Sequence, residues 1–314
     1  MHTHHAQPET SFTILLPLVS IIIPNYNHGR YLRQRMESIL CQTYAHYEVI
    51  ILDDHSTDNS MEVIRQYAHH ERVSCIVGNE TNSGSPFKQW QRGIAVAKGD
   101  IIWIAESDDY CKADMLERLV QTYIKNNCTL AFTRSLTVND LGQPMHVCQR
   151  MFRKDQAWSG ARFVKQYLNT ANRIHNASSA IFSKEAAMAA DPVYASFKAS
   201  GDWVFWIEIA RQGNVAVVSE PLNYFRRSES TCTATSTLNG IGSIEDHRVL
   251  TILKQKKLYS PYHAFLKKKR MAKYIYCQKH RYKDEQTRKK VEAVWQLPWY
   301  YWLLAKCSYL LKHA

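Results

Sequence analysis

The chain has 314 residues, of which 45% are hydrophobic and 11% aromatic, so it can bury a large core in one or two domains. Its 40 Lys and Arg residues exceed its 28 Asp and Glu residues by 12. The segment 254–290 alone contains 14 basic and 2 acidic residues, so the excess charge belongs to one region and indicates a local contact. The eight cysteines form no CxxC pair, which argues against a disulfide or zinc framework and favours reduced core thiols in the cytosol.

The first 17 residues are predicted to be a disordered leader. The apolar run 12–23 follows no basic residue, since the first Lys or Arg is Arg30, whereas a signal peptide requires a basic start. The run is also shorter than the roughly 20 apolar residues that a membrane-spanning helix needs.

Continuous β-branched and apolar runs predict buried strands, and apolar residues at helical spacing predict helices between them. The expected helix signals are a cap at Ser56, Thr57 or Asp58, a helix closed by Gly99, and a capping box formed by Asp114 and Glu117. The predicted strands are 19–24, 47–54, 72–78, 100–109 and 130–136, and the predicted helices lie at 31–41, after 55, at 86–99 and at 113–126.

This alternation of strands and helices is typical of an α/β fold with a mainly parallel sheet covered by helices on both faces. Ligands of such sheets bind beyond the carboxyl ends of the strands. The polar residues that follow "IIIP", "IILDD" and "WIAESDD" fall at that edge, so three separate segments form one candidate site.

Glu106, Asp108 and Asp109 follow the fourth strand within four positions. One of them could cap a helix, but three neighbouring carboxylates favour a hard cation such as Mg²⁺ or Mn²⁺, which binds one or two carboxylates together with substrate phosphates. Asp53 and Asp54 end the second strand, where they either cap a helix or accept hydrogen bonds from a ribose or a base. No GxGxxG motif follows the early strands, which argues against a dinucleotide site.

The segment "VSIIIPNYNHGRYLRQRMESILCQTYAHYEVIILDDHSTDNS", followed by "GIAVAKGDIIWIAESDD" and "GDWVFWIEIARQGNVAVVSEPLNYFRR", resembles the family 2 inverting glycosyltransferases. The resemblance covers about residues 18–232 and implies a GT-A catalytic domain. It implies transfer of a sugar from a nucleotide-diphosphate donor, with UDP as the expected nucleotide, to a hydroxyl of a glycan or lipid-linked acceptor, with inversion and a divalent cation.

The resemblance also implies roles for single residues. Pro24, Tyr26 and Asn27 would line the nucleotide pocket, and Asp53 and Asp54 would hold uracil and ribose. Asp108 would lie near the ribose or sugar and the metal, Asp109 would bind the metal, and Asp202 would be the general base. From the residues alone, Asp202 instead reads as the cap of a helix over 203–211.

Two positions depart from the family pattern. Glu106 stands where many relatives have aspartate, which keeps a carboxylate. Ser228 stands where many have a histidine that contacts the diphosphate or metal, so Arg226 or Arg227 would supply that charge. Lys88 is a further candidate for the diphosphate, and Glu106, His175 and Asn176 are candidates for contact with the donor sugar or acceptor.

Residues 233–314 are predicted to form a basic, aromatic-rich helical extension. Lysines interleaved with tyrosines at 254–290 and the closing aromatic segment suit an anionic membrane surface, whereas a helical face folded back on the catalytic domain is the alternative. The enzyme would then be cytoplasmic, with a peripheral position on the inner face of the membrane. A nucleotidyltransferase would require a glycine-rich phosphate loop near the first strand, and a basic nucleic-acid-binding protein would leave the carboxylates unexplained, so no nucleic acid is expected as partner.

Overall fold

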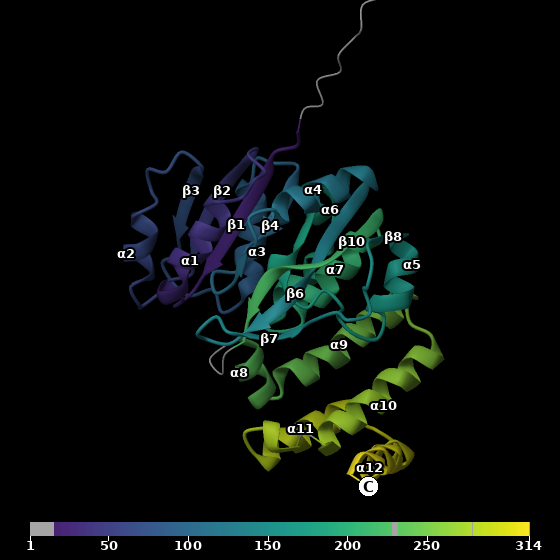
Figure 1. The fold of residues 1–314 in the computed structure, drawn as a ribbon. Helices are drawn as coiled ribbons and strands as arrows, with labels where there is room; N and C mark the ends of the chain where they lie inside the picture. The colour runs from purple at the N-terminus through teal and green to yellow at the C-terminus, as the bar shows by residue number, and fades with distance from the viewer. Residues whose placement is uncertain (1–15, 228–231, 278, 314) are drawn as a thin grey trace, which may run out of the picture.

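A ten-stranded sheet forms the centre of the computed structural model, which describes residues 16–227, 232–277 and 279–313 (Figure 1). The strand order is β3-β2-β1-β4-β9-β6-β10-β5, with β7 paired to β6 and β8 to β10. The long ladders, such as β1–β2 and β6–β10, are parallel, and the antiparallel pairings are short. The strands are β1 (Val19–Asn25), β2 (Tyr47–Asp53), β3 (Val73–Gly78), β4 (Ile101–Ile104), β5 (Tyr110–Cys111), β6 (Cys128–Val138), β7 (Pro144–Val147), β8 (Gln156–Ser159), β9 (Ala180–Ser183) and β10 (Asn214–Arg226).

Helices cover both faces of this sheet, as the sequence predicts. Along β1, Ile21 and Ile23 pack into one hydrophobic cluster while Ile22 packs into the other, because successive side chains of a strand point to opposite faces. The first cluster includes residues of α1 and α4, and the second includes residues of α3, α6 and α7. The α-helices of this part are α1 (Gly29–Leu40), α2 (Ser60–Arg65), α3 (Pro86–Val96), α4 (Met115–Lys125), α5 (Gly160–Phe163), α6 (Lys184–Met188) and α7 (Gly201–Ala210); shorter turns are η1 (Val164–Leu168), η2 (Ala177–Ser179) and η3 (Pro192–Ser196).

Local details differ from the sequence predictions at several helix ends. The prediction that Gly99 closes a helix is wrong, because α3 already ends at Val96. A Cβ at Gly99 would lie 2.4 Å from the Leu18 carbonyl oxygen, so the glycine instead permits close approach of the chain to the start of β1.

The predicted capping box at α4 is also not formed. Asp114 is the N-cap residue but its side chain makes no cap hydrogen bond; it pairs with Arg118 at 3.7 Å instead. Glu117 accepts a hydrogen bond from the Thr43 hydroxyl. The N-cap residue of α2 is Asn59, whose side chain makes no cap hydrogen bond, so the prediction of a cap at Ser56, Thr57 or Asp58 is also wrong. Asp58, one position earlier, accepts a hydrogen bond from the Ser60 amide at 2.9 Å, and the same carboxylate accepts one from the Gly29 amide at the start of α1.

The C-terminal helices pack against the sheet domain below α7 (Figure 1). Val249 and Leu253 of α9 belong to the same hydrophobic cluster as Phe205 of α7, and Trp295 of α11 extends that cluster. Folding back on the catalytic part, one of the two alternatives for the tail, is therefore what the structure shows. The helices are α8 (Cys232–Leu238), α9 (Ile241–Gln255), α10 (Pro261–Cys277), α11 (Glu285–Trp295) and α12 (Trp299–His313), with a turn η4 (Lys279–Arg281).

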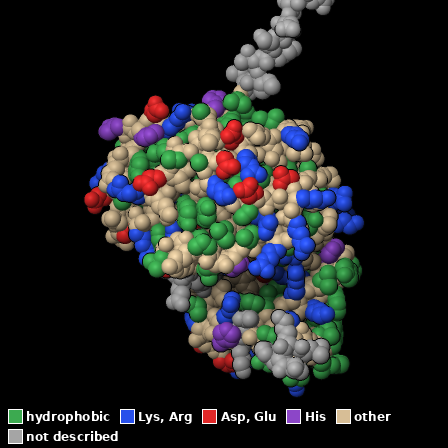
Figure 2. Space-filling view, in the orientation of Figure 1, with side chains coloured by type: hydrophobic (Ala, Val, Ile, Leu, Met, Phe, Trp, Pro, Cys, Tyr) green, Lys and Arg blue, Asp and Glu red, His purple; other side chains and the backbone are tan. Residues whose placement is uncertain are grey.

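Among the described helices, none combines the length and the apolar character that crossing a bilayer requires. Basic side chains gather on the middle of the face shown in Figure 2, next to the junction between the sheet domain and the C-terminal helices. The seven cysteines whose side chains the structure describes are all unpaired, but only Cys111 and Cys128 are buried, so the expectation of core thiols holds for these two. The predicted leader falls mostly on residues 1–15, outside the described residues, and a domain boundary at 232 stays a prediction.

Candidate active site

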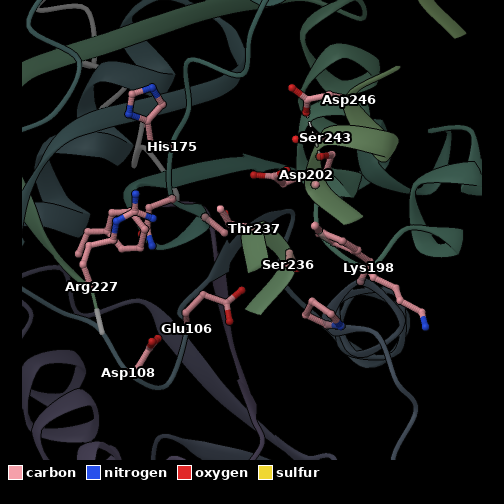
Figure 3. A pocket seen from close by; sticks show the side chains of 18 of the residues that line it. Glu106, Asp108, His175, Lys198, Asp202, Arg227, Ser236, Thr237, Ser243 and Asp246 are labelled. Atoms are coloured by element: carbon pink, nitrogen blue, oxygen red, sulfur yellow. Dashed lines mark hydrogen bonds between the residues drawn. The ribbon is translucent and has the colours of Figure 1, made fainter. Parts of the chain in front are cut away.

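A cavity of about 510 Å³ lies between the carboxyl-end loops of the sheet and the helices α8, α9 and α10. Figure 3 shows Glu106 and Asp108 at one side of this cavity, and Asp202 with Asp246 at the other. Of the described residues that line it, six were predicted from the sequence: Glu106, Asp108, His175, Asn176, Asp202 and Arg227.

Burial raises the pKa of all three carboxylates after β4. Burial, together with the charges of Asp108 and Asp109, raises the pKa of Glu106 to about 8, although its carboxylate accepts a hydrogen bond from the Trp90 indole N–H at 3.0 Å. Burial and Asp108 raise the pKa of Asp109 to about 6, and burial raises that of Asp108. At neutral pH Glu106 is therefore protonated unless a positive charge joins the cluster.

Asp109 and Asp108 have different surroundings. Asp109 is 1% exposed, and its carboxylate accepts hydrogen bonds from the Asn176 amide at 2.8 Å, the Ser178 hydroxyl at 2.7 Å and the Arg226 backbone N–H at 2.9 Å. Its Oδ2 also lies 4.0 Å from the fully buried guanidinium of Arg35. Asp109 thus ties the end of β4 to η2 and β10, whereas the carboxylate of Asp108 faces the cavity (Figure 3).

Arg226 is held by protein acceptors. Its guanidinium donates to the Asp108 carbonyl at 2.8 Å, to the carbonyls of Asn139 and Asp140, and to the Gln34 side chain. The neighbouring Arg227 lines the cavity instead. Ser228, where the family pattern has histidine, lies outside the described residues.

The predicted nucleotide residues gather at the carboxyl ends of β1 and β2. Asp53 accepts hydrogen bonds from the Asn25 amide and from both the backbone and hydroxyl of Ser56. Asp54 accepts from Ser83, Asn79 and Gln89. Both aspartates are buried and organise the surrounding loops.

The remaining predicted residues lie near this edge. Tyr26 is 45% exposed, Asn27 has a positive φ of 54° and its side-chain oxygen accepts from the Thr57 amide, and Pro24 is buried in β1. Lys88 is exposed in the first turn of α3, where its ammonium donates to the Ser83 carbonyl. His28, which follows β1 in the same region, does line the cavity, and its Nδ1 lies 3.0 Å from the Ser107 hydroxyl.

Asp202 lies in the first turn of α7, after the N-cap residue Ser200, so it is not the helix cap. Its carboxylate accepts hydrogen bonds from the Asn172 amide at 2.7 Å and from the Trp203 backbone N–H at 2.7 Å. Burial raises its pKa to about 7, and the charges of Asp246 and Glu245 add to that effect. A carboxylate with a pKa near 7 in a cavity has the proton affinity that a general base needs at neutral pH.

The start of α7 is held by α9. Glu245 accepts hydrogen bonds from three successive backbone N–H groups, those of residues 198–200, at 2.8 to 2.9 Å. Asp246 accepts from the Ser200 hydroxyl at 3.1 Å and pairs with the Lys267 ammonium of α10 at 2.6 Å. No sequence motif marks these residues, because they act from helix surfaces in a segment that reads only as basic and amphipathic.

His175 also lines the cavity (Figure 3). Loss of solvation and the nearby charges of Arg173 and Arg227 lower its pKa to about 4, so the imidazole is neutral at neutral pH. The Asn176 amide donates to Asp109, and its side-chain oxygen accepts a hydrogen bond from the Asn223 amide at 3.0 Å. Asn176 thus joins β10 to the acidic strand end, by which we mean Glu106, Asp108 and Asp109 after β4.

A family model described as "Glycosyl transferase family 2" matches residues 20–188, more than half of the chain. The chain therefore belongs to glycosyl transferase family 2. It is 41% identical over 104 residues to glycosyltransferase GlyG of Streptococcus pneumoniae, a stretch that covers 33% of this chain and 34% of that protein. It is 33% identical over 129 residues to the putative teichuronic acid biosynthesis glycosyltransferase TuaG of Bacillus subtilis, covering 41% of this chain and 51% of that one.

Among solved structures, S. aureus TarS 1–349 in complex with UDP-GlcNAc superimposes with a TM-score of 0.60 at 21% identity, covering 74% of this chain and 65% of that chain. This likeness confirms the predicted GT-A fold. The chain matches about a third to a half of the length of the curated relatives GlyG and TuaG.

Proposed function

We propose that the protein transfers a sugar from a nucleotide-diphosphate donor to a hydroxyl of a glycan or lipid-linked acceptor, with inversion at the anomeric carbon. The observation that carries the proposal is the placement of Asp202, with a pKa of about 7, in the same cavity as Glu106 and Asp108. UDP is the proposed nucleotide, since a structural neighbour was solved with UDP-GlcNAc. A hexose-type donor is proposed on the same ground.

The proposed reaction is one displacement. The acceptor oxygen forms its bond to the anomeric carbon while the bond from that carbon to the diphosphate oxygen breaks, and the acceptor proton passes to the Asp202 carboxylate. Asn172 and the Trp203 backbone N–H orient that carboxylate. The guanidinium of Arg227 lines the same cavity and is the cationic side chain proposed to stabilise the charge on the leaving diphosphate.

Mg²⁺ or Mn²⁺ fits the acidic strand end on chemical grounds. Burial raises the pKa of Glu106 and Asp108 although Arg35 lies nearby, so an added cation would favour their charged forms, and carboxylate oxygen is the ligand that these ions prefer. The described residues contain no group of three or more His, Cys, Asp or Glu side chains arranged for a metal, so the diphosphate would have to supply further ligands. We assign Asp108 and Glu106 to the ion ahead of Asp109, whose oxygens already accept three hydrogen bonds; when bound, the ion would neutralise diphosphate charge.

Isothermal titration with UDP, in Mn²⁺ and in EDTA, combined with the anomeric configuration of the product, tests this function. We expect UDP to bind more tightly with Mn²⁺ and the product to have the anomeric configuration opposite to the donor. Equal affinity in EDTA would contradict the metal assignment, and a product of retained configuration would contradict the single displacement.

A peripheral position on an anionic membrane, through residues 254–314, is a separate proposal. Its support is the basic composition of this segment and the exposure of Trp299, Leu303 and Leu310 on α12, at 74%, 52% and 56%. Liposome flotation with neutral and with anionic lipid tests it, and equal recovery in both would contradict it.

A further inference from the structure

A second cavity, of about 530 Å³, lies where α10 passes the segment before η2. Four basic side chains line it, together with the hydroxyl-bearing Thr170 and Ser308, and no acidic residue is among its described lining. The basic residues are Arg173, Lys269, Arg270 and Lys273.

These charges lack acidic partners within the described part of the chain. None of the ion pairs found there involves any of the four. Burial and the nearby charge of Arg270 lower the pKa of Arg173, so the half-buried guanidinium of Arg173 lies close to the charge of the exposed Arg270. Like charges in such a position repel, and an anion is what relieves the repulsion.

This cavity adjoins the candidate active site. Arg270 lines both cavities, and Arg173 directly follows Asn172, whose amide donates to the Asp202 carboxylate. A molecule that presents a hydroxyl to Asp202 can therefore reach the basic cavity with the part next to that hydroxyl. By contrast, Lys267, the basic residue one turn before Arg270, is already paired with Asp246.

We propose that the second cavity binds a phosphate or carboxylate group of the acceptor, so that the acceptor is an anionic glycan. Guanidinium groups hold both anions through paired, charge-assisted hydrogen bonds, and a cavity lined by one sign of charge concentrates counter-ions. The assignment of the bound group to an acceptor rests on the proposed function, whereas anion binding by the cavity does not depend on it.

The test measures binding of two soluble polyanions, inorganic tripolyphosphate and oligogalacturonate, to the full chain at moderate salt, with neutral dextran oligomers as control ligand. Arg173→Gln/Arg270→Gln removes two charges from the cavity. Lys289→Gln/Lys290→Gln is the matched control, since it removes two exposed charges from α11. Lys269→Glu, at an exposed position of the same cavity, is a second variant in case the double variant folds poorly.

We expect at least tenfold weaker binding of a polyanion to Arg173→Gln/Arg270→Gln and to Lys269→Glu, and less than threefold weaker binding to the control variant. Wild-type affinity in both cavity variants, or an equal loss in the control, would overturn the proposal. Vesicles of phosphatidylcholine with and without phosphatidylglycerol form the other arm: if only anionic vesicles bind through these residues, the cavity holds a lipid headgroup and the acceptor proposal is wrong.

UDP affinity, measured on the same proteins, keeps the two proposals distinguishable. We expect it to be unchanged in Lys269→Glu and in Lys289→Gln/Lys290→Gln, because none of these three residues lines the candidate active site. Failure of the wild-type protein to bind UDP would count against the proposed function. Equal polyanion affinity in the wild type and in the cavity variants would count against anion binding by the second cavity.

Discussion

Asp202→Asn removes a charge that the folded protein disfavours, so the variant should be more stable and less active. Burial raises the pKa of Asp202 from 3.8 to about 7, and at about 1.4 kcal/mol per pKa unit this difference corresponds to at most about 4 kcal/mol of free energy of unfolding. The side chain borders a cavity and is only partly shielded from water, so we expect a gain of about 1–2 kcal/mol.

The size of this stability gain depends on pH. Because the folded-state pKa is the higher one, the penalty develops as pH rises from about 4 to about 7 and remains complete above pH 7. Urea unfolding should therefore show Asp202→Asn to be more stable than wild type at pH 8 and nearly equal to it at pH 4. Turnover should fall by about 10²–10⁴-fold, the usual effect of losing a general base, with UDP affinity kept.

Glu220→Gln is a control of opposite sign. Hydrogen bonds from Lys112 and Arg118 lower the pKa of Glu220 to about 2, so this carboxylate stabilises the fold above pH 4.5 and loses the effect as pH falls toward 2. Its side chain is 42% exposed, which limits the loss in Glu220→Gln at pH 8 to about 1 kcal/mol or less. If the stability difference between Asp202→Asn and wild type were the same at pH 4 and pH 8, the account of the Asp202 carboxylate would be refuted.

Four further variants separate the roles of neighbouring residues. Asp108→Asn should abolish the Mn²⁺-dependent part of UDP affinity in calorimetry. Asp109→Asn should instead lower the free energy of unfolding by about 1–3 kcal/mol, because it disturbs a buried, hydrogen-bonded carboxylate. If Asp109→Asn abolished the Mn²⁺ effect and Asp108→Asn only destabilised the fold, the two roles would be exchanged. Glu245→Gln should slow turnover several-fold and cost about 1–2 kcal/mol of stability while UDP affinity is kept, and unchanged turnover would contradict its positioning of α7. Arg35→Met should cost about 3–5 kcal/mol in urea unfolding, because buried Asp109 loses its nearest cation, and a cost below about 1 kcal/mol would argue against that pairing.

The part of the fold that was predictable consists of long, locally encoded elements. β1 and β2 are continuous apolar runs, and a strand buried on both faces needs little beyond such a run. β5, β7, β8, β9 and β10 were not predicted. The first four have only two to four residues, and such strands exist only through pairing with distant segments. Similarly, α2 is shorter than its apolar pattern indicates.

The candidate site was predictable where carboxylates end strands. Glu106 and Asp108 could be placed at the sheet edge from position alone, and both line the cavity. The sequence could not tell which of Asp108 and Asp109 faces inward, since the answer depends on hydrogen bonds from η2 and β10. Glu245 was out of reach for the same reason, since its partners are backbone N–H groups about 45 positions away.

The hold of Glu245 on the amides before α7 has a consequence for how such enzymes can be rebuilt. A designer who exchanges the C-terminal helices to change acceptor preference also removes the carboxylate that anchors the helix carrying Asp202, together with the two charges that raise its pKa. Acceptor preference and turnover rate would therefore change together in such a chimera. A replacement segment would keep the rate only if it also brought an acidic side chain to residues 198–200.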